Sequence, residues 1–264
     1  MGLKEKTDQP KPAPAPGGAE MDSIAVMAGR LAHEIKNPLN VIYMNLQLLQ
    51  EEWQDPATPK ERRLLQKIEI LKQEAQRLRD TLDDFLRFAR PGTLRLEAAD
   101  LNTVVEEVVD FVRPDAVSRD IRILTSFFPR PLDCNIDRDL FKQALLNIFL
   151  NAQQAIPDAA DSPGGAPPSA SLAGGARDIL VKTSLQKGLA SIDVSDTGVG
   201  IPPDVLPKIF DAFYSTKASG SGLGLPTTKR IIEAHGGIIE VFSTVGKGTS
   251  FRITLAQAET GGGQ

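Results

Sequence analysis

The chain contains very little cysteine, histidine or aromatic side chain. Cys134 is the single cysteine among 264 residues, which excludes an intramolecular disulfide and a cysteine-based zinc site. Aromatic residues make up only 5% of the chain while hydrophobic residues reach 41%, so the core must consist mainly of Leu, Ile and Val. Of the two histidines, His33 falls in a helical pattern and His235 precedes Gly-Gly. A lone histidine on a helix is by default a structural residue.

Long apolar runs and an excess of positive charge are also missing. No apolar run reaches the roughly 18 residues that span a bilayer, and no signal-peptide core is present. Membrane attachment is expected only if a longer natural protein or a partner supplies it. The net charge of −4 excludes a broad basic face for nucleic acid. Low cysteine content fits a reducing compartment, and we expect a cytoplasmic location.

Proline and glycine mark the segments that do not join a core. Residues 1–21 carry four prolines at alternate positions followed by Gly-Gly, and predict a disordered tail. Residues 157–177 are rich in Pro, Gly, Ala and Ser and predict a flexible loop. Residues 258–264 predict a second flexible tail.

Two long helices are predicted over 22–52 and 60–90. Asp22 or Ser23 can cap the first, and Pro38 should kink it or loosen one turn. The second has apolar residues in alternating steps of four and three: Leu64, Ile68, Leu71, Ala75, Leu78, Leu82 and Phe85. This heptad pattern predicts a coiled coil, and one hairpin would leave its seam exposed to water. We therefore expect a homodimer in which both helices form a four-helix bundle.

Arg90-Pro91-Gly92 ends the second helix and separates the hairpin, 22–91, from a mixed segment over 92–257. Helices are expected from a cap near Asn102, over 140–156 after a cap at Asp137, and over 223–235. Strands are expected near 93–97, 121–127, 134–136, 179–185, 190–194, 238–243 and 250–255. Antiparallel strands with helices on one face predict an α+β sandwich.

Two polar residues lie among the apolar residues of the helix predicted over 140–156. Asn147 and Asn151 lie four residues apart and hence on one face. Apolar residues surround them, so at least one asparagine should sit where a polar group needs a partner. An exposed helix face is the alternative interpretation.

Two glycine runs follow. Asp196-Thr-Gly-Val-Gly comes after a predicted strand, where Asp196 can accept a hydrogen bond from an exocyclic amine and Gly198 and Gly200 allow close approach of a flat ligand. A plain turn is the alternative. Gly220-Ser-Gly-Leu-Gly opens into a predicted helix, and its free N–H groups suit an anion such as phosphate. A flexible helix start is the alternative there.

An aromatic segment lies between the two glycine runs. It contains Phe210, Phe213 and Tyr214, followed by Lys217. The aromatic residues can anchor a lid with Lys217 reaching a phosphate. Equally, they can pin an ordinary loop to the core.

The order of these motifs resembles the Bergerat ATP-binding fold of sensor histidine kinases, type II topoisomerases, mismatch-repair ATPases and a family of heat-shock chaperones. The run His33-Glu-Ile-Lys-Asn-Pro-Leu39 is similar to the phosphoacceptor box of two-component histidine kinases. The resemblance covers residues 22–256. It implies a catalytic core with a dimerisation and phosphoacceptor hairpin and an ATP-binding domain.

The resemblance also implies roles for the residues of the phosphoacceptor box. His33 would receive the phosphoryl group from ATP, and Glu34 would hydrogen-bond the other ring nitrogen and act as base. The phosphoryl group would then pass to an aspartate of a separate response regulator. Asn37 would position a water that dephosphorylates that regulator, although an ordinary surface role for Asn37 stays open.

For the nucleotide, the resemblance implies Asn151 as the Mg²⁺ ligand, Asn147 as its supporting residue and Asp196 as the group that binds adenine. Gly198 and Gly200 would lie beside the base. The phosphates would meet the second glycine run, with help from the lysine before it: Lys217, Gly220, Gly222, Leu223 and Gly224. The chain departs from many members of the family at Gln154, where they carry a Lys or Arg that touches phosphate.

Two other classes of function stay open. One is a dimeric scaffold or phosphatase that binds a response regulator without strong kinase activity, against which the complete nucleotide motifs argue. The other is a Bergerat-fold ATPase or a serine kinase of the anti-sigma type. The heptad hairpin that carries His33 argues against that class.

Overall fold

The computed structural model describes residues 18–53, 58–89, 94–157, 177–217 and 220–258. Side chains of residues 18–34 and 87–89 are outside this description. The predicted tails at 1–21 and 258–264 and the loop at 157–177 fall largely outside the described residues. The chain divides into two compact units, Met1–Arg90 and Pro91–Gln264, each of which is described by itself.

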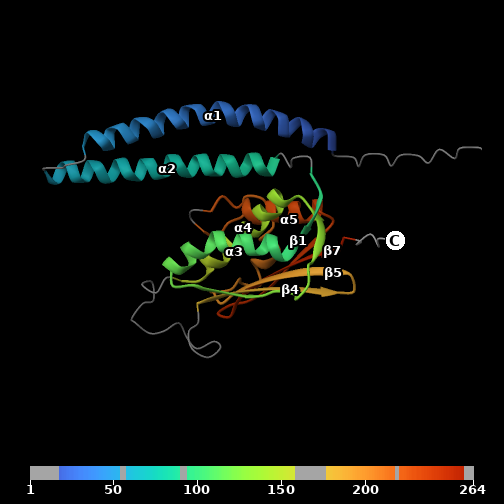
Figure 1. Cartoon of the computed structure of the whole chain (residues 1–264). Coiled ribbons are helices and arrows are strands. Elements are labelled where there is room, and N and C mark those ends of the chain that lie inside the picture. The colour runs from blue at the N-terminus through green and yellow to red at the C-terminus, as the bar shows by residue number, and fades with distance from the viewer. Residues whose placement is uncertain (1–17, 54–57, 90–93, 158–176, 218–219, 259–264) are drawn as a thin grey trace, which may run out of the picture. The chain divides into compact units, whose positions relative to one another are not determined.

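The first unit is a pair of long helices, α1 (Gly18–Glu52) and α2 (Pro59–Ala89). Helix α1 begins before the predicted cap at Asp22 or Ser23 and continues through Pro38, bowed but unbroken (Figure 1). A capping box starts α2: the Glu61 carboxylate accepts from the Thr58 N–H at 3.0 Å, and the Thr58 hydroxyl accepts from the Glu61 N–H at 3.3 Å.

Contacts between α1 and α2 use only part of the predicted apolar seam. Ile68 and Ala75 are buried, each 5% exposed. Leu64, Leu71 and Leu78, each seven residues apart, are 40%, 55% and 50% exposed. One hairpin therefore covers one side of the heptad pattern and leaves the other side open to solvent.

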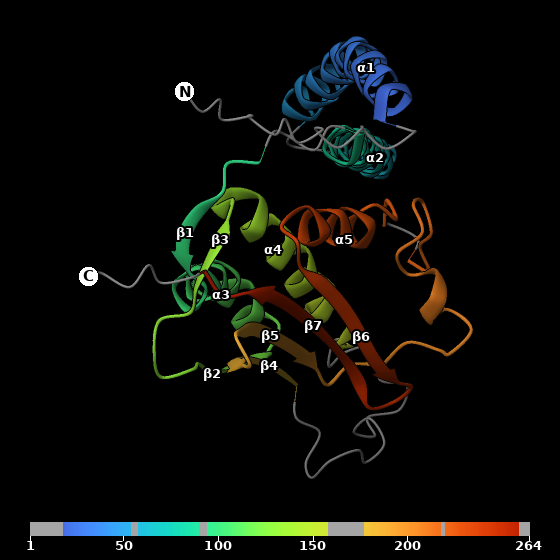
Figure 2. The same cartoon turned by 90° about the vertical axis from the view of Figure 1, so that its right-hand side faces the viewer.

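The second unit is built on a five-stranded sheet of order β2-β4-β5-β7-β6. Its strands are β2 (Arg122–Ser126), β4 (Asp178–Gln186), β5 (Leu189–Asp196), β6 (Ile238–Thr244) and β7 (Gly248–Ala256). A separate antiparallel pair joins β1 (Glu97–Asp100) to β3 (Asp133–Ile136). Helices α3 (Leu101–Ser118), α4 (Arg138–Ala155) and α5 (Gly224–Ala234) cover one face of the large sheet (Figure 2). The expected layering of helices on one sheet face is confirmed.

The expectation of antiparallel strands is wrong for one strand pair of the large sheet. β2 and β4 run parallel, with Leu124 opposite Leu180. The chain between them crosses over through β3 and α4, and such a crossover returns the next strand in the same direction. The sheet is therefore mixed, and the fold is a helical hairpin followed by a layered α/β domain.

Two local predictions at the start of this unit are also wrong. The first strand lies at Glu97–Asp100 rather than near 93–97. Asp100, not Asn102, caps α3 by accepting from the Asn102 N–H at 3.1 Å. The Asn102 side chain instead donates to the carbonyls of Phe128 and Arg130, at 3.0 and 3.1 Å. An anionic side chain is the stronger partner for the free N–H groups of a helix start.

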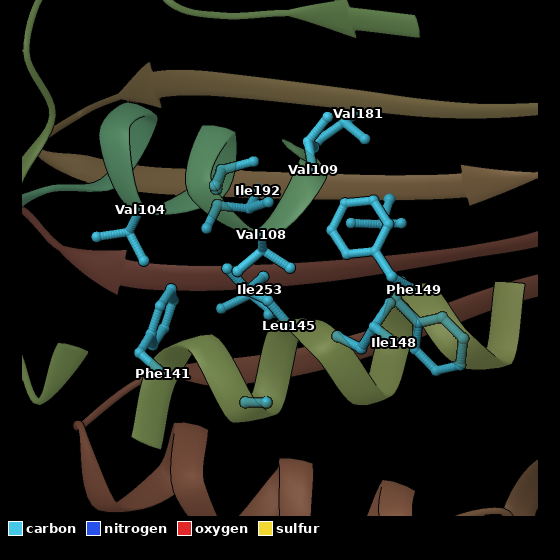
Figure 3. Close-up of a cluster of buried hydrophobic side chains, with 14 of the residues drawn as sticks. Val104, Val108, Val109, Phe141, Leu145, Ile148, Phe149, Val181, Ile192 and Ile253 are labelled. Carbon is cyan, nitrogen blue, oxygen red and sulfur yellow. The ribbon is translucent and has the colours of Figure 1, made fainter. Parts of the chain in front are cut away.

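Aliphatic side chains from the helices and the inner sheet face form the core of the second unit (Figure 3). The labelled residues come from α3, α4 and three strands: Val104, Val108, Val109, Phe141, Leu145, Ile148, Phe149, Val181, Ile192 and Ile253. Full burial of each such side chain contributes about 1.5–3 kcal/mol. This packing fixes where the polar face of α4 and the end of β5 lie.

His235 is a structural residue at the end of α5. Its Nε2 accepts from the Asp137 N–H at 2.9 Å, and its Nδ1 lies 2.6 Å from the Ile231 carbonyl. The first contact requires an unprotonated Nε2, so the proton sits on Nδ1 and donates to Ile231. The ring thus joins the end of α5 to the start of α4.

Candidate functional site

Helix α4 presents Asn147 on a half-buried face toward the start of α5. The Asn147 amide donates to the Gly224 carbonyl at 3.2 Å and to the Thr228 hydroxyl at 3.4 Å. Thr228 is fully buried and donates in turn to the same Gly224 carbonyl at 2.9 Å. This network fixes the first turn of α5 against α4, and no pattern in the sequence indicates the part that Thr228 takes in it.

Asp196 ends β5 as a buried carboxylate that is 6% exposed. Its Oδ1 accepts from the Gly198 N–H at 2.8 Å and from the Thr249 N–H at 3.2 Å. Burial raises the pKa of Asp196 to about 6, against the lowering effect of these two N–H groups and of the Lys217 ammonium. Oδ2 accepts from no described residue, which leaves it open to a donor that the protein does not supply.

The first glycine run is required by the protein's own packing. A Cβ at Gly198 would lie 2.4 Å from the Ala155 carbonyl oxygen at the end of α4. Gly200 has φ of 72°, and a Cβ there would lie 2.2 Å from the Thr244 carbonyl oxygen at the end of β6. These glycines therefore let the segment after Asp196 pass between α4 and the β6–β7 turn. The close approach of a flat ligand at these glycines stays a prediction.

The second glycine run leads into α5 without a side-chain cap. Gly222 has φ of 68°, its carbonyl accepts from the Phe213 N–H at 3.0 Å, and a Cβ would lie 2.6 Å from the Phe213 carbonyl carbon. The Leu223 side chain is fully buried, so only its backbone faces the helix start. Gly220 lies beside Ser215, where a Cβ would be 2.6 Å from the hydroxyl oxygen. The Leu223 N–H donates to the Ser221 hydroxyl at 3.4 Å and Pro226 has no N–H, so the N–H groups of Gly224 and Leu225 are the ones that this start of α5 offers to an anion.

The aromatic residues of the segment between the two glycine runs have different environments, so neither predicted role describes the whole segment. Phe210 packs against the core, whereas Phe213 is 63% exposed and adopts φ of 66°. Lys217, which follows, donates to the Asn151 Oδ1 at 3.2 Å and to the Gln154 Oε1 at 2.7 Å. Surrounding protein atoms lower the pKa of Lys217, and the Asp196 carboxylate opposes that effect. The segment is thus anchored at both ends.

Together these residues place an open carboxylate oxygen, amide oxygens, an ammonium and an uncapped helix start around the carboxyl-terminal half of α4. Such a set can hydrogen-bond a polar ring at Asp196 and hold an anion at α5. No three His, Cys, Asp or Glu side chains cluster for a metal within the described part of the chain. The Asn151 and Gln154 amide oxygens still suit Mg²⁺, which commonly takes few protein ligands and several phosphate oxygens.

Two family models match the chain over most of its length. Residues 136–259 match "Histidine kinase-, DNA gyrase B-, and HSP90-like ATPase", and residues 25–94 match "His Kinase A (phospho-acceptor) domain". The sensor histidine kinase ZraS of Escherichia coli is 34% identical over 230 residues, which cover 87% of this chain and 44% of that protein. The chain belongs to the two-component histidine kinases. Like them, it combines the two domains that the models describe.

Solved structures of histidine kinases have the same fold. Full-length ShkA in complex with AMPPNP is 26% identical, with a TM-score of 0.67 over 89% of this chain and 46% of that one. ThkA in complex with the response regulator protein TrrA is 24% identical, with a TM-score of 0.59 over 91% of this chain and 64% of that one. The chain spans about half the length of the curated relatives it matches.

The run predicted to be the phosphoacceptor box, His33–Leu39, lies on α1 within the residues that match the phospho-acceptor domain model. The backbone at His33 and Glu34 is helical, while both side chains are outside the described residues. Asn37, one turn later, is exposed. No helix among the described residues is long and apolar enough to cross a membrane.

Proposed function

We propose that the chain is an ATP-dependent protein-histidine kinase that phosphorylates its own His33 and passes the phosphoryl group to an aspartate of a separate response regulator. The observation that carries this proposal is the buried Asp196 at the end of β5 together with the uncapped start of α5, in a chain that also matches the phospho-acceptor domain model. Of the three α-helices described in the second unit, α3 and α4 are capped by Asp100 and Asp137, whereas α5 starts without a side-chain cap. We propose that this phosphorylation and transfer take place in the cytoplasm, where ATP and the response regulator are found.

Asp196 would recognise the adenine ring through its open Oδ2, which accepts from the exocyclic amine. Gly198 and Gly200 hold the backbone on which Asp196 sits. The phosphates would lie at the start of α5, against the backbone of Gly220, Gly222, Leu223 and Gly224. Asn147 supports this position because it bonds directly to the Gly224 carbonyl.

Asn151 would hold Mg²⁺ through its Oδ1, with the remaining ligands supplied by phosphate oxygens and water. When bound, the ion would neutralise charge on the transferring phosphate. Lys217 adds a further positive charge at the same end of α4.

In the transfer step, an unprotonated nitrogen of His33 attacks the γ-phosphorus, the bond from phosphorus to the β–γ bridging oxygen breaks, and ADP leaves. Glu34 would accept the proton from the other ring nitrogen as the attacking nitrogen gains positive character. The N–P bond is then broken by an aspartate oxygen of the regulator. Asn37 lies exposed one turn along the helix, where it could orient a water for dephosphorylation of the regulator.

A homodimer is proposed through 22–52 and 60–90. Within one hairpin, the heptad residues of α2 alternate between exposed and buried positions from Leu64 to Leu78, and Leu82 and Phe85 are half-buried. The exposed apolar side chains of α1 add to this surface: Ile35, Val41, Ile42, Met44, Leu48 and Leu49. A second copy would cover both sets and complete a four-helix bundle.

The proposal is tested by incubating the full chain with ATP labelled at the γ-phosphate. The expected product carries a label that is lost in acid and kept in base, as a phosphoramidate requires, and the label moves to a receiver domain that has its aspartate. Tight ATP binding with no acid-labile label would instead favour a scaffold or a regulator phosphatase. Label on a serine or release of free phosphate alone would favour the ATPase or serine-kinase class.

A further inference from the structure

The ammonium of Lys217 is held by two side chains of α4. It lies 2.7 Å from the Gln154 Oε1 and 3.2 Å from the Asn151 Oδ1. These two residues are three positions apart in the helix, so their side chains leave the same face one turn apart. Lys217 reaches them from the segment between the two glycine runs.

Both acceptors are neutral amide oxygens. No carboxylate of the described residues forms an ion pair with Lys217. Amide oxygens are also the hard ligands that Mg²⁺ accepts. Two such oxygens converging on one positive charge therefore form a small cation position, and a residue of the chain occupies it.

A lysine and a metal ion cannot share that position. An ammonium at 3.2 Å from the Asn151 oxygen and a metal at the roughly 2.1 Å of a Mg²⁺–oxygen bond would lie close together beside the same atom, and two cations this close repel each other. Because of this repulsion, the ammonium has to move away if Asn151 is to bind a metal. The shorter of its two contacts, to Gln154, is the one that resists this movement.

We propose that Lys217 is a tethered occupant of the cation position on α4, that Gln154 is the positioning residue that holds it there, and that Mg²⁺ and Lys217 exclude each other at the Asn151 oxygen. This inference rests on the proposed role of Asn151. It implies that Gln154 helps to set the Mg²⁺ concentration that nucleotide binding requires. Once displaced, Lys217 is free to approach the phosphates from the same segment.

The test measures the affinity of the full chain for AMPPNP by calorimetry, from metal-free buffer to millimolar Mg²⁺. Mg²⁺ is expected to increase this affinity, and the quantity compared between variants is the half-point, the Mg²⁺ concentration at which half of the increase is reached. In Gln154→Ala this half-point should fall about threefold, the size expected from the loss of one solvent-accessible hydrogen bond. Lys217→Met should lower it at least as far. The double variant should match Lys217→Met, because Gln154 acts only through the lysine.

Gln143→Ala is the matched control. It makes the same substitution on α4 at a half-buried glutamine whose side chain forms no hydrogen bond with the described residues, and its half-point should equal that of the unsubstituted chain. A half-point that is unchanged or higher in Gln154→Ala would overturn the inference. So would full additivity of the two substitutions.

Asn151→Ala separates this inference from the proposed function. If Asn151→Ala removes the Mg²⁺ enhancement while Gln154→Ala leaves the half-point unchanged, the metal uses Asn151 and only the exclusion by Lys217 is wrong. If Asn151→Ala keeps the normal Mg²⁺ enhancement, the metal does not use Asn151, and both the inference and the proposed metal ligand are wrong.

Discussion

Asp196 is kept ionised in a place where ionisation is unfavourable. Its pKa is raised to about 6, so the folded protein binds this proton more tightly than the unfolded chain, whose aspartate pKa is near 3.9. Stability is therefore lost as the pH rises from about 4 to about 6. The carboxylate is a cost to folding that a ligand with an amine donor can offset.

Asp196→Asn should stabilise the protein in the absence of nucleotide. The amide keeps an oxygen for the Gly198 and Thr249 N–H groups and has no charge to bury. We expect the free energy of unfolding at pH 8 to rise by about 1–3 kcal/mol, which corresponds to the raised pKa of the carboxyl group, measured as the urea midpoint by circular dichroism. At pH 4 the difference should disappear, and a variant less stable at pH 8 would show that the charge is not the dominant factor.

Nucleotide binding should depend on the same proton. At pH 5, one unit below the pKa, about a tenth of Asp196 is ionised, so affinity for ADP should fall about tenfold relative to pH 7.5. Asp196→Asn should bind at least tenfold more weakly at pH 7.5 and lose this pH dependence, which isolates it from titration of the phosphates. Asp193→Asn, on the same strand and paired with Arg252, is the control and should bind normally.

For single residues, local sequence patterns indicate the important polar side chains better than they indicate the hydrogen-bond partners of those side chains. Local patterns indicate Asn147 and Asp196 as candidate polar groups, and the structure shows Asn147 bonded to α5 and Asp196 buried at the end of β5, while their roles toward nucleotide stay predictions. The contacts of Thr249 and Thr228 were missed because they depend on the pairing of β5 with β7 and of α4 with α5. The link from Gln154 to Lys217 joins residues 63 positions apart, and no local pattern indicates it.

Among the elements, those with strong local signals were predicted well. Asp137 caps α4 as expected, and Gly236 ends α5 at φ of 70°. Lys187 and Gly188 both have positive φ and form the predicted turn between β4 and β5. The parallel pairing of β2 with β4 was missed because strand direction follows from the path of the chain through α4, which hydrophobic alternation does not encode.

The contact between the end of α4 and the first glycine run predicts a large effect of one methyl group. Gly198→Ala would push a Cβ into the Ala155 carbonyl, and the Val199 N–H would lose its 3.0 Å bond to that oxygen. We expect a loss of about 2–4 kcal/mol in the free energy of unfolding, measured by urea denaturation. Gly188→Ala, where nothing lies within 4 Å and only the positive φ is unfavourable, should cost about 1 kcal/mol. Equal effects would mean that the close contact relaxes freely.

For the whole molecule, the exposed side of the α2 heptad pattern predicts association. Leu71, at the middle of that side, is 55% exposed in one hairpin. Leu71→Glu would place a charge in the proposed bundle seam, and we expect the chain to sediment as a monomer where the unsubstituted chain sediments as a dimer. Leu189→Glu, at an exposed leucine of the second unit, should leave the mass unchanged. A dimer that persists in Leu71→Glu would place the interface elsewhere.

The central claim is that this chain phosphorylates His33, and the presence of only two histidines allows a direct test. The measurement is acid-labile label from γ-labelled ATP on His33→Gln and on His235→Gln, with ADP affinity measured in parallel to show that the second unit is folded. His33→Gln should bind ADP normally and carry no label. His235→Gln loses the contact to the Asp137 N–H, a structural effect, and should still carry label whenever it binds ADP. Label retained in His33→Gln would contradict the account.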